Sequence, residues 1–138
     1  MNEDLIREEI LTHSRSNQNG LFPTAATLSA RMTNPLCGDH VELRIHTQDQ
    51  IILNIGFKAK ACAICSASAS MVSQELKGQS IKLALQLAES FEQTLIGPHH
   101  DPWPGLLENF RCFEHIKVTP SRKMCALLPW IVLKKAMA

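Results

Sequence analysis

The chain of 138 residues contains no tyrosine, and aromatic residues make up 5% of it. With few aromatic side chains to stack on bases and no zinc-finger spacing, the sequence does not predict nucleic-acid binding. No apolar run approaches the ~18 residues of a membrane-spanning helix, so no membrane partner is expected. The first ten residues, MNEDLIREEI, are too acidic for a secretory signal. We therefore expect a cytoplasmic protein.

Long linkers, internal repeats and low-complexity segments are also missing. The length predicts one domain over residues 1–138, and 45% apolar with 20% charged residues is typical of a globular protein. Disulfides are rare in the cytoplasm, and the five cysteines are an odd number. Metal binding or thiol chemistry is therefore favoured over a disulfide framework.

The net charge of +1 is unevenly distributed. Residues 111–138 contain six Lys or Arg and one Glu, so this segment carries +5 and the remainder of the chain −4. Such a basic segment is typical of a solvated helix face, and it is also compatible with an acidic protein partner or a phosphate.

The first half of the chain predicts a helix followed by a small sheet. Residues 2–13 have a capping residue, early acids and an apolar side, which indicates a helix. Residues 24–33 could form a short strand. Apolar residues alternate with polar ones over 41–46, and a second strand over 51–57 follows a polar turn, which predicts an antiparallel hairpin.

The second half predicts helices. Apolar residues recur at helical spacing after Cys62 and stop at Gly78, a residue that commonly ends a helix in a left-handed turn. Another helix is expected from Ser80 to residue 96, then an irregular stretch and a helical turn near 106–110. Because proline removes a helical hydrogen bond, Pro129 predicts two short C-terminal helices or one kinked helix. The predicted fold class is α+β: an N-terminal helix, about three antiparallel strands, and four or so packed helices.

Four side chains at predicted element boundaries carry metal-binding chemistry: Cys37, Asp39, Cys62 and Cys125. Three thiolates and a carboxylate suit a tetrahedral zinc ion or part of an iron–sulfur cluster. Cys62 precedes a helix, where backbone N–H groups and the helix dipole favour a thiolate. The ligands are far apart in sequence, however, and buried, purely structural cysteines explain the spacing nearly as well.

Three motifs in order give these residues more weight: NPLCGDH before the hairpin, CAICSASASM at the central helix, and RKMCALLPW near the C-terminus. Together they resemble the iron–sulfur cluster assembly scaffold family of the IscU, SufU and NifU N-terminal type, and are closest to its SufU-like branch. His13 and the pair Asn19-Gly20 are loosely similar to a further segment of that family. The resemblance implies a SufE/IscU-like fold with its metal site at Cys37, Asp39, Cys62 and Cys125.

The same resemblance implies the function. Zn²⁺, or a transient [2Fe-2S] or [4Fe-4S] cluster, would occupy the site, with Cys37, Cys62 and Cys125 as the thiol ligands. The partners would be a cysteine desulfurase of the SufS or IscS type and apo iron–sulfur acceptor proteins. Cys37 or Cys125, both expected on turns, would accept persulfide sulfur, and Arg122 would orient Asp39 or a partner carboxylate. Whether the chain acts as a sulfurtransferase or as a non-enzymatic scaffold is left open.

The sequence also departs from the family pattern. Ala59 and Ala61 stand where the family has glycines before the central cysteine, and Met124 replaces the histidine that IscU-type members carry before the last cysteine. The loss of that histidine favours the SufU-like interpretation. The family's chaperone-recruiting LPPVK motif has no counterpart in this chain.

Two other function classes remain open. The chain could be a structural zinc module for protein interaction, or a thiol oxidoreductase using the C-x-x-C pair Cys62 and Cys65. Cys65, where the family commonly has Ser, could also share the metal. Cys112 is expected to pack beside Phe110 and Phe113, and His40 could support the ligands from behind. The adjacent His99 and His100 are expected to be ordinary loop residues.

Overall fold

The computed structural model describes residues 3–16, 18–35, 37–97, 103, 105–116 and 119–138. Its elements in chain order are α1 (Glu3–Ser14), β1 (Leu28–Thr33), β2 (His40–Gln48), β3 (Ile51–Lys60), α2 (Ala63–Leu76), α3 (Ile81–Ile96), the 3₁₀ helix η1 (Gly105–Ile116) and α4 (Pro120–Met137). The predicted α+β class, with one helix before a three-stranded sheet and the other helices after it, is confirmed. The extent of the domain stays a prediction.

The sheet is antiparallel with the order β1-β2-β3. Val41, Leu43 and Ile45 of β2 are fully buried, as their alternation with polar residues predicts. The turn between β2 and β3 is shorter than the predicted polar segment. It consists of Asp49 and Gln50, both with positive φ, the backbone of a two-residue hairpin turn whose twist matches the strands.

The segment after α1 covers the edge of β3. Gly20 N–H donates to the Phe57 carbonyl over 2.7 Å. The Asn19 side-chain amide accepts from Ala59 N–H at 2.9 Å and donates to the Ala59 carbonyl at 3.0 Å. The Leu21 backbone passes so close to Gly56 that a Cβ there would collide with it. Backbone groups of an edge strand are thus satisfied by the chain itself.

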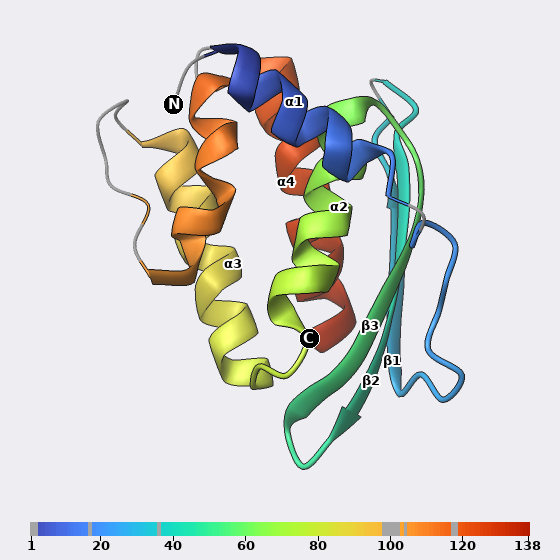
Figure 1. Ribbon diagram of the computed structural model, residues 1–138. Coiled ribbons are helices and arrows are strands. Elements are labelled where there is room, and N and C mark those ends of the chain that lie inside the picture. The colour runs from blue at the N-terminus through green and yellow to red at the C-terminus, as the bar shows by residue number, and fades with distance from the viewer. Residues whose placement is uncertain (1–2, 17, 36, 98–102, 104, 117–118) are drawn as a thin grey trace.

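Helix α2 is the centre of the packing. Its residues from Cys65 to Ser73 are all buried, so the small Ala and Ser side chains let neighbours approach from every side rather than from one face. α1, α4 and β3 pack against it, and the Ser68 hydroxyl donates to the Ala126 carbonyl of α4 over 2.7 Å. Figure 1 shows α2 between the sheet and α3. The helix ends at Leu76 before Gly78, whose φ of +87° confirms the predicted left-handed stop.

The C-terminal region settles one open alternative and differs from expectation at η1. α4 runs through Pro129 as one helix, so of the two predicted alternatives, two short helices or one kinked helix, the first is wrong. Pro129 cannot donate to the Cys125 carbonyl four residues earlier, yet the helix packs against α2, α3 and the sheet, and this tertiary packing holds it. η1 is also longer than the single helical turn predicted. Among the described helices, none is long and apolar enough to cross a membrane.

Candidate metal centre

The turn between β1 and β2 presents the first two candidate ligands. Gly38 has a φ of +77°, and its N–H donates to the Asn34 carbonyl over 2.7 Å. Asn34 N–H in turn donates to the Asp39 carbonyl at 2.7 Å, which fixes the base of the turn. As a result Cys37 is exposed on the turn, whereas Asp39 is 7% exposed and points into the protein.

The start of α2 contributes a second set of groups beside this turn. Cys62 is the N-cap of α2, as predicted, and its Sγ accepts a hydrogen bond from Cys65 N–H at 3.4 Å. Cys62 N–H donates to Asp39 Oδ1 over 3.0 Å. This hydrogen bond ties the loop before β2 to the loop after β3.

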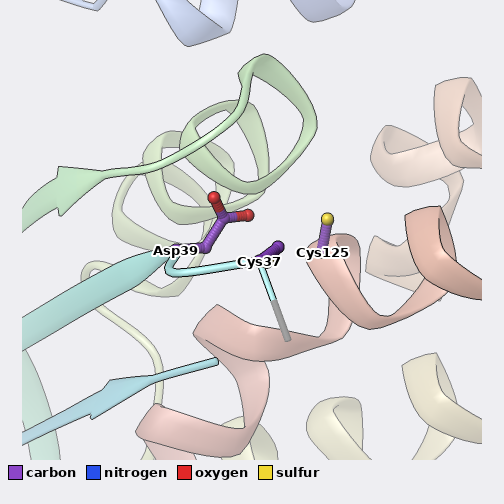
Figure 2. A group of neighbouring side chains, drawn as sticks. All are labelled: Cys37, Asp39 and Cys125. Carbon is purple, nitrogen blue, oxygen red and sulfur yellow. The ribbon is translucent and has the colours of Figure 1, made fainter. Parts of the chain in front are cut away.

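Cys125 comes from the second turn of α4. Its Sγ, the Cys37 Sγ and one carboxylate oxygen of Asp39 all lie within 4.8 Å of one another. Figure 2 shows the Asp39 carboxylate and the Cys125 sulfur on the same side of the turn that carries Cys37. Cys62 adjoins this group through its backbone, whose N–H donates to Asp39 Oδ1, but its sulfur is not among the three ligand atoms that lie within 4.8 Å of one another. Three residues distant in sequence thus meet at one corner of the fold, and the start of α2 with Cys62 lies beside them.

The charge balance at this corner suits a cation. Asp39 Oδ2 is buried and has no hydrogen-bond partner among the described residues. A buried carboxylate oxygen left without a donor is costly, and a metal ion would satisfy it. Three thiols and one carboxylate are a donor set that zinc accepts. The residues present therefore fit a zinc ion.

Without a cation the thiols of Cys62 and Cys125 have a pKa above the ordinary cysteine value and are harder to ionise. Burial raises the pKa of Cys62, and this effect outweighs the lowering by the Cys65 N–H at the helix terminus. Burial also raises the pKa of Cys125, helped by the thiol of Cys62 and the charge of Asp39. The helix N-terminus favours the Cys62 thiolate as predicted, but burial is the larger effect and leaves the pKa of Cys62 raised.

Comparison with known proteins shows which family this chain belongs to. The family model described as "NifU-like N terminal domain" matches residues 6–101, a segment that includes Cys37, Asp39 and Cys62. The chain belongs to the NifU-like N-terminal domain family. Relatives of the chain include the zinc-dependent sulfurtransferase SufU of Bacillus subtilis, 30% identical over 99% of this chain and 91% of that protein.

Other relatives and solved structures agree. The iron–sulfur cluster assembly scaffold protein IscU of Thermotoga maritima is 29% identical over 94% of this chain and 90% of its own length. FiSufU from the thermophile Fervidobacterium islandicum AW-1 superposes with a TM-score of 0.87 and 27% identity, over 99% of this chain and 100% of that one. A NifU-like protein from Brucella abortus shares the fold at a TM-score of 0.82 and 21% identity. The resemblance read from the three motifs is confirmed.

Several predicted site residues lie elsewhere or serve differently. Cys125 is inside a helix, so the expectation that it sits on a turn is wrong. Arg122 is exposed on the first turn of α4 and lines a groove with α1 and η1, while the N–H of Cys62 orients Asp39. His40 Nδ1 is hydrogen-bonded to Thr33 Oγ1 at 2.8 Å and so braces the base of the β1–β2 turn.

The two remaining cysteines are both fully buried. Cys65 lies one turn into α2 beside the centre, outside the close group of three ligand atoms. Cys112 is in the hydrophobic core with Phe110 and Phe113, as expected. His99 and His100 fall outside the described residues.

The structure adds Asn19, which sequence reasoning noted only as a loose family likeness. Its amide pairs with both backbone groups of Ala59, three residues before Cys62, and so holds the strand that delivers Cys62. The segment Asn19-Gly20 carried the signal, but its partner is forty residues away and no local pattern could have indicated it.

Proposed function

We propose that this protein accepts persulfide sulfur from a cysteine desulfurase at a zinc centre formed by Cys37, Asp39, Cys62 and Cys125. The observation that carries the proposal is the meeting of two thiols and a buried carboxylate oxygen that has no hydrogen-bond partner among the described residues, with the helix cap Cys62 bonded to the same carboxylate through its N–H. The similarity to a protein named as a zinc-dependent sulfurtransferase supports it. A desulfurase of the SufS or IscS type and apo iron–sulfur proteins are the proposed partners.

The metal would supply one thing, a charge that keeps the thiols deprotonated and shielded from oxidation. Asp39 is the hard oxygen donor among sulfurs, so it is the ligand most easily exchanged. When a partner docks, ligand exchange that releases a cysteine would free a thiolate at the exposed turn. The location in the cytoplasm and the absence of membrane and nucleic-acid partners stay predictions.

Cys37 is the preferred sulfur acceptor of the two candidates. It is exposed on a turn, whereas Cys125 is held in α4 and partly buried. In the transfer the Cys37 thiolate attacks the outer sulfur of the desulfurase persulfide, the sulfur–sulfur bond of that persulfide breaks, and the desulfurase cysteine leaves as a thiolate. Cys37 then carries the sulfur as a persulfide. The exposed Arg122, three residues before Cys125 on α4, would pair with a partner carboxylate.

Persulfide mapping tests this function. The protein is incubated with a cysteine desulfurase and cysteine, alkylated, digested and analysed by mass spectrometry. We expect the extra sulfur on Cys37 in the wild type and loss of most transfer in Cys37→Ser, with Cys112→Ser as the matched control. Label found on Cys65 or Cys112 alone contradicts the proposal, as does a protein purified without added metal that contains no zinc.

A second function, cluster scaffolding, is favoured by the similarity to IscU scaffold proteins. The same four residues would hold a nascent [2Fe-2S] or [4Fe-4S] cluster as cargo. Anaerobic reconstitution with iron and sulfide should then give a cluster that transfers to an apo-acceptor. The Asp39→Ala variant should hold that cluster longer, because the exchangeable oxygen ligand is gone. No transferable cluster in either protein would leave sulfur transfer as the function.

A further inference from the structure

Cys62 and Cys65 form a C-x-x-C pair on the first turn of α2. The Cys65 backbone N–H donates to Cys62 Sγ over 3.4 Å, which holds the Cys62 sulfur against the helix turn that carries Cys65. Cys62 has an extended backbone as the N-cap, and Cys65 is one turn further along the same helix. A C-x-x-C pair at a helix N-terminus is an arrangement in which the two sulfurs can close a disulfide.

The two thiols differ completely in accessibility. Cys62 is exposed, whereas Cys65 is 0% exposed and packed in the hydrophobic core. A desulfurase persulfide or a soluble oxidant can therefore reach Cys62 but not Cys65. Chemistry at Cys65 must come through its neighbour, with the advantage in rate that a fixed neighbouring group has over a diffusing thiol.

We propose that Cys65 is a resolving thiol that discharges sulfur from Cys62 as sulfide. This step rests on the proposed function, since it requires a persulfide on Cys62. Cys62 and Cys37 are both exposed, so Cys62 can receive that sulfur directly from the desulfurase or by thiol exchange from the Cys37 persulfide.

The reaction needs no external reductant in its forward direction. The Cys65 sulfur attacks Cys62 Sγ, a bond forms between the two cysteine sulfurs, and the bond from Cys62 Sγ to the outer sulfur breaks. The outer sulfur leaves as HS⁻ and takes the thiol proton to become H₂S. It gains two electrons, and the two cysteine sulfurs lose one each. A cellular thiol such as glutathione must then reduce the Cys62–Cys65 disulfide before another cycle.

The step has a consequence for the metal. A disulfide at Cys62 removes one of the four proposed zinc donors, because a thiolate and not a disulfide sulfur is the ligand. Sulfide release and zinc release should therefore occur together. This coupling gives a readout that does not depend on cluster assembly.

The test uses the full-length zinc protein charged with sulfur, either by a desulfurase with cysteine or chemically by sodium polysulfide. After desalting into thiol-free buffer, sulfide, free zinc and disulfides are measured over time. Wild type should release sulfide and zinc in step and acquire a Cys62–Cys65 disulfide. Cys65→Ser should keep its persulfide, and its rate of sulfide release should be lower than that of wild type by a factor of about ten or more. Cys112→Ser, the other fully buried cysteine, should behave like wild type.

Two results would overturn the proposal: wild type that keeps its persulfide without forming this disulfide, or Cys65→Ser that releases sulfide as fast as wild type. If Cys65→Ser does not fold, wild type equilibrated with oxidised glutathione decides, because failure to form the Cys62–Cys65 disulfide excludes a resolving pair. If only polysulfide charges the protein, and the charged protein then releases sulfide and forms the Cys62–Cys65 disulfide, the proposed function fails while Cys65 still acts as the resolving thiol.

Discussion

Two regions of this molecule use cysteine and buried polar groups in opposite ways. The metal centre joins the β1–β2 turn, the N-terminus of α2 and the second turn of α4. The aromatic cluster joins α3, η1 and α4 and consists of Phe91, Trp103, Phe110, Phe113 and Trp130. In the cluster Cys112 is one more buried apolar group, whereas at the centre Cys37 and Cys62 are exposed.

Each region also contains one buried polar atom without a partner among the described residues. In the cluster it is the indole N–H of Trp130, which is packed against aromatic rings. An indole N–H is a donor only and cannot coordinate a cation. At the centre it is Asp39 Oδ2, an acceptor with thiols around it. The comparison shows that residue type alone does not make a site. Function follows where unsatisfied acceptors meet thiols that a partner can reach.

The largest effect is expected from breaking the aromatic cluster at Phe91. This residue is fully buried and contacts four other rings, with Trp130 stacked at 4.9 Å. Phe91→Ala should lower the free energy of unfolding by about 3–5 kcal/mol, because a large cavity opens. The exposed Ile96→Ala on the same helix, the control, should change it by less than about 0.5 kcal/mol. Urea denaturation measures both, and a small loss in Phe91→Ala would mean that the rings repack.

At Asp39 we expect the opposite of Phe91: a small change in the free energy of unfolding and a large loss of zinc affinity. In Asp39→Ala the unfolding free energy of the metal-free protein should change by about 1 kcal/mol or less, since one hydrogen bond is lost and an unpaired buried oxygen removed. Zinc affinity should fall at least as far as the roughly 10–100-fold lost when outer-sphere partners are mutated. Competition with a chromophoric chelator measures it, with the exposed Glu8→Ala as control. Unchanged affinity would remove Asp39 from the ligand set.

Local sequence pattern predicted much of the scaffold around both regions. Alternation gave the β2–β3 hairpin, and helical spacing with a terminal glycine gave α2 and its end at Leu76. These features depend on near neighbours in the chain. The length of η1 and the unbroken course of α4 through Pro129 depend on packing between distant segments, so local rules underestimated both.

The candidate site divides in the same way. That Cys37 and Asp39 lie on a turn and Cys62 caps a helix followed from Gly38 and from the helical pattern. Residue chemistry singled out Cys125 as a candidate ligand, but its weight as a partner of the others came from family resemblance, because nothing in local spacing brings a residue of α4 to the start of α2. Its place within the helix was missed because Pro129 suggested a break nearby.

The clamp formed by Asn19 tests whether the centre depends on its supporting strand. Asn19→Ala removes two hydrogen bonds to buried Ala59 and should lower the unfolding free energy by about 1–2 kcal/mol. Asn19→Asp keeps the acceptor but loses the donor, so its loss should be smaller. Denaturation together with hydrogen exchange at the Ala59 amide measures the effect. Equal exchange in all three proteins would show that the clamp does not hold β3.

The smallest effect is expected from Cys112 and depends on pH. Burial in the core raises the pKa of Cys112 to about 12, above its ordinary value of 9.0. The folded protein therefore keeps this thiol neutral while the unfolded chain ionises near pH 9, so the stability it contributes is complete below pH 9 and declines from there toward pH 12. Between pH 8 and pH 10 the stability advantage of wild type over Cys112→Ser should shrink by about 1.4 kcal/mol. Parallel urea titrations at the two pH values measure this difference, in which the other thiols cancel. A constant advantage would mean that Cys112 is more hydrated than its place beside the aromatic cluster implies.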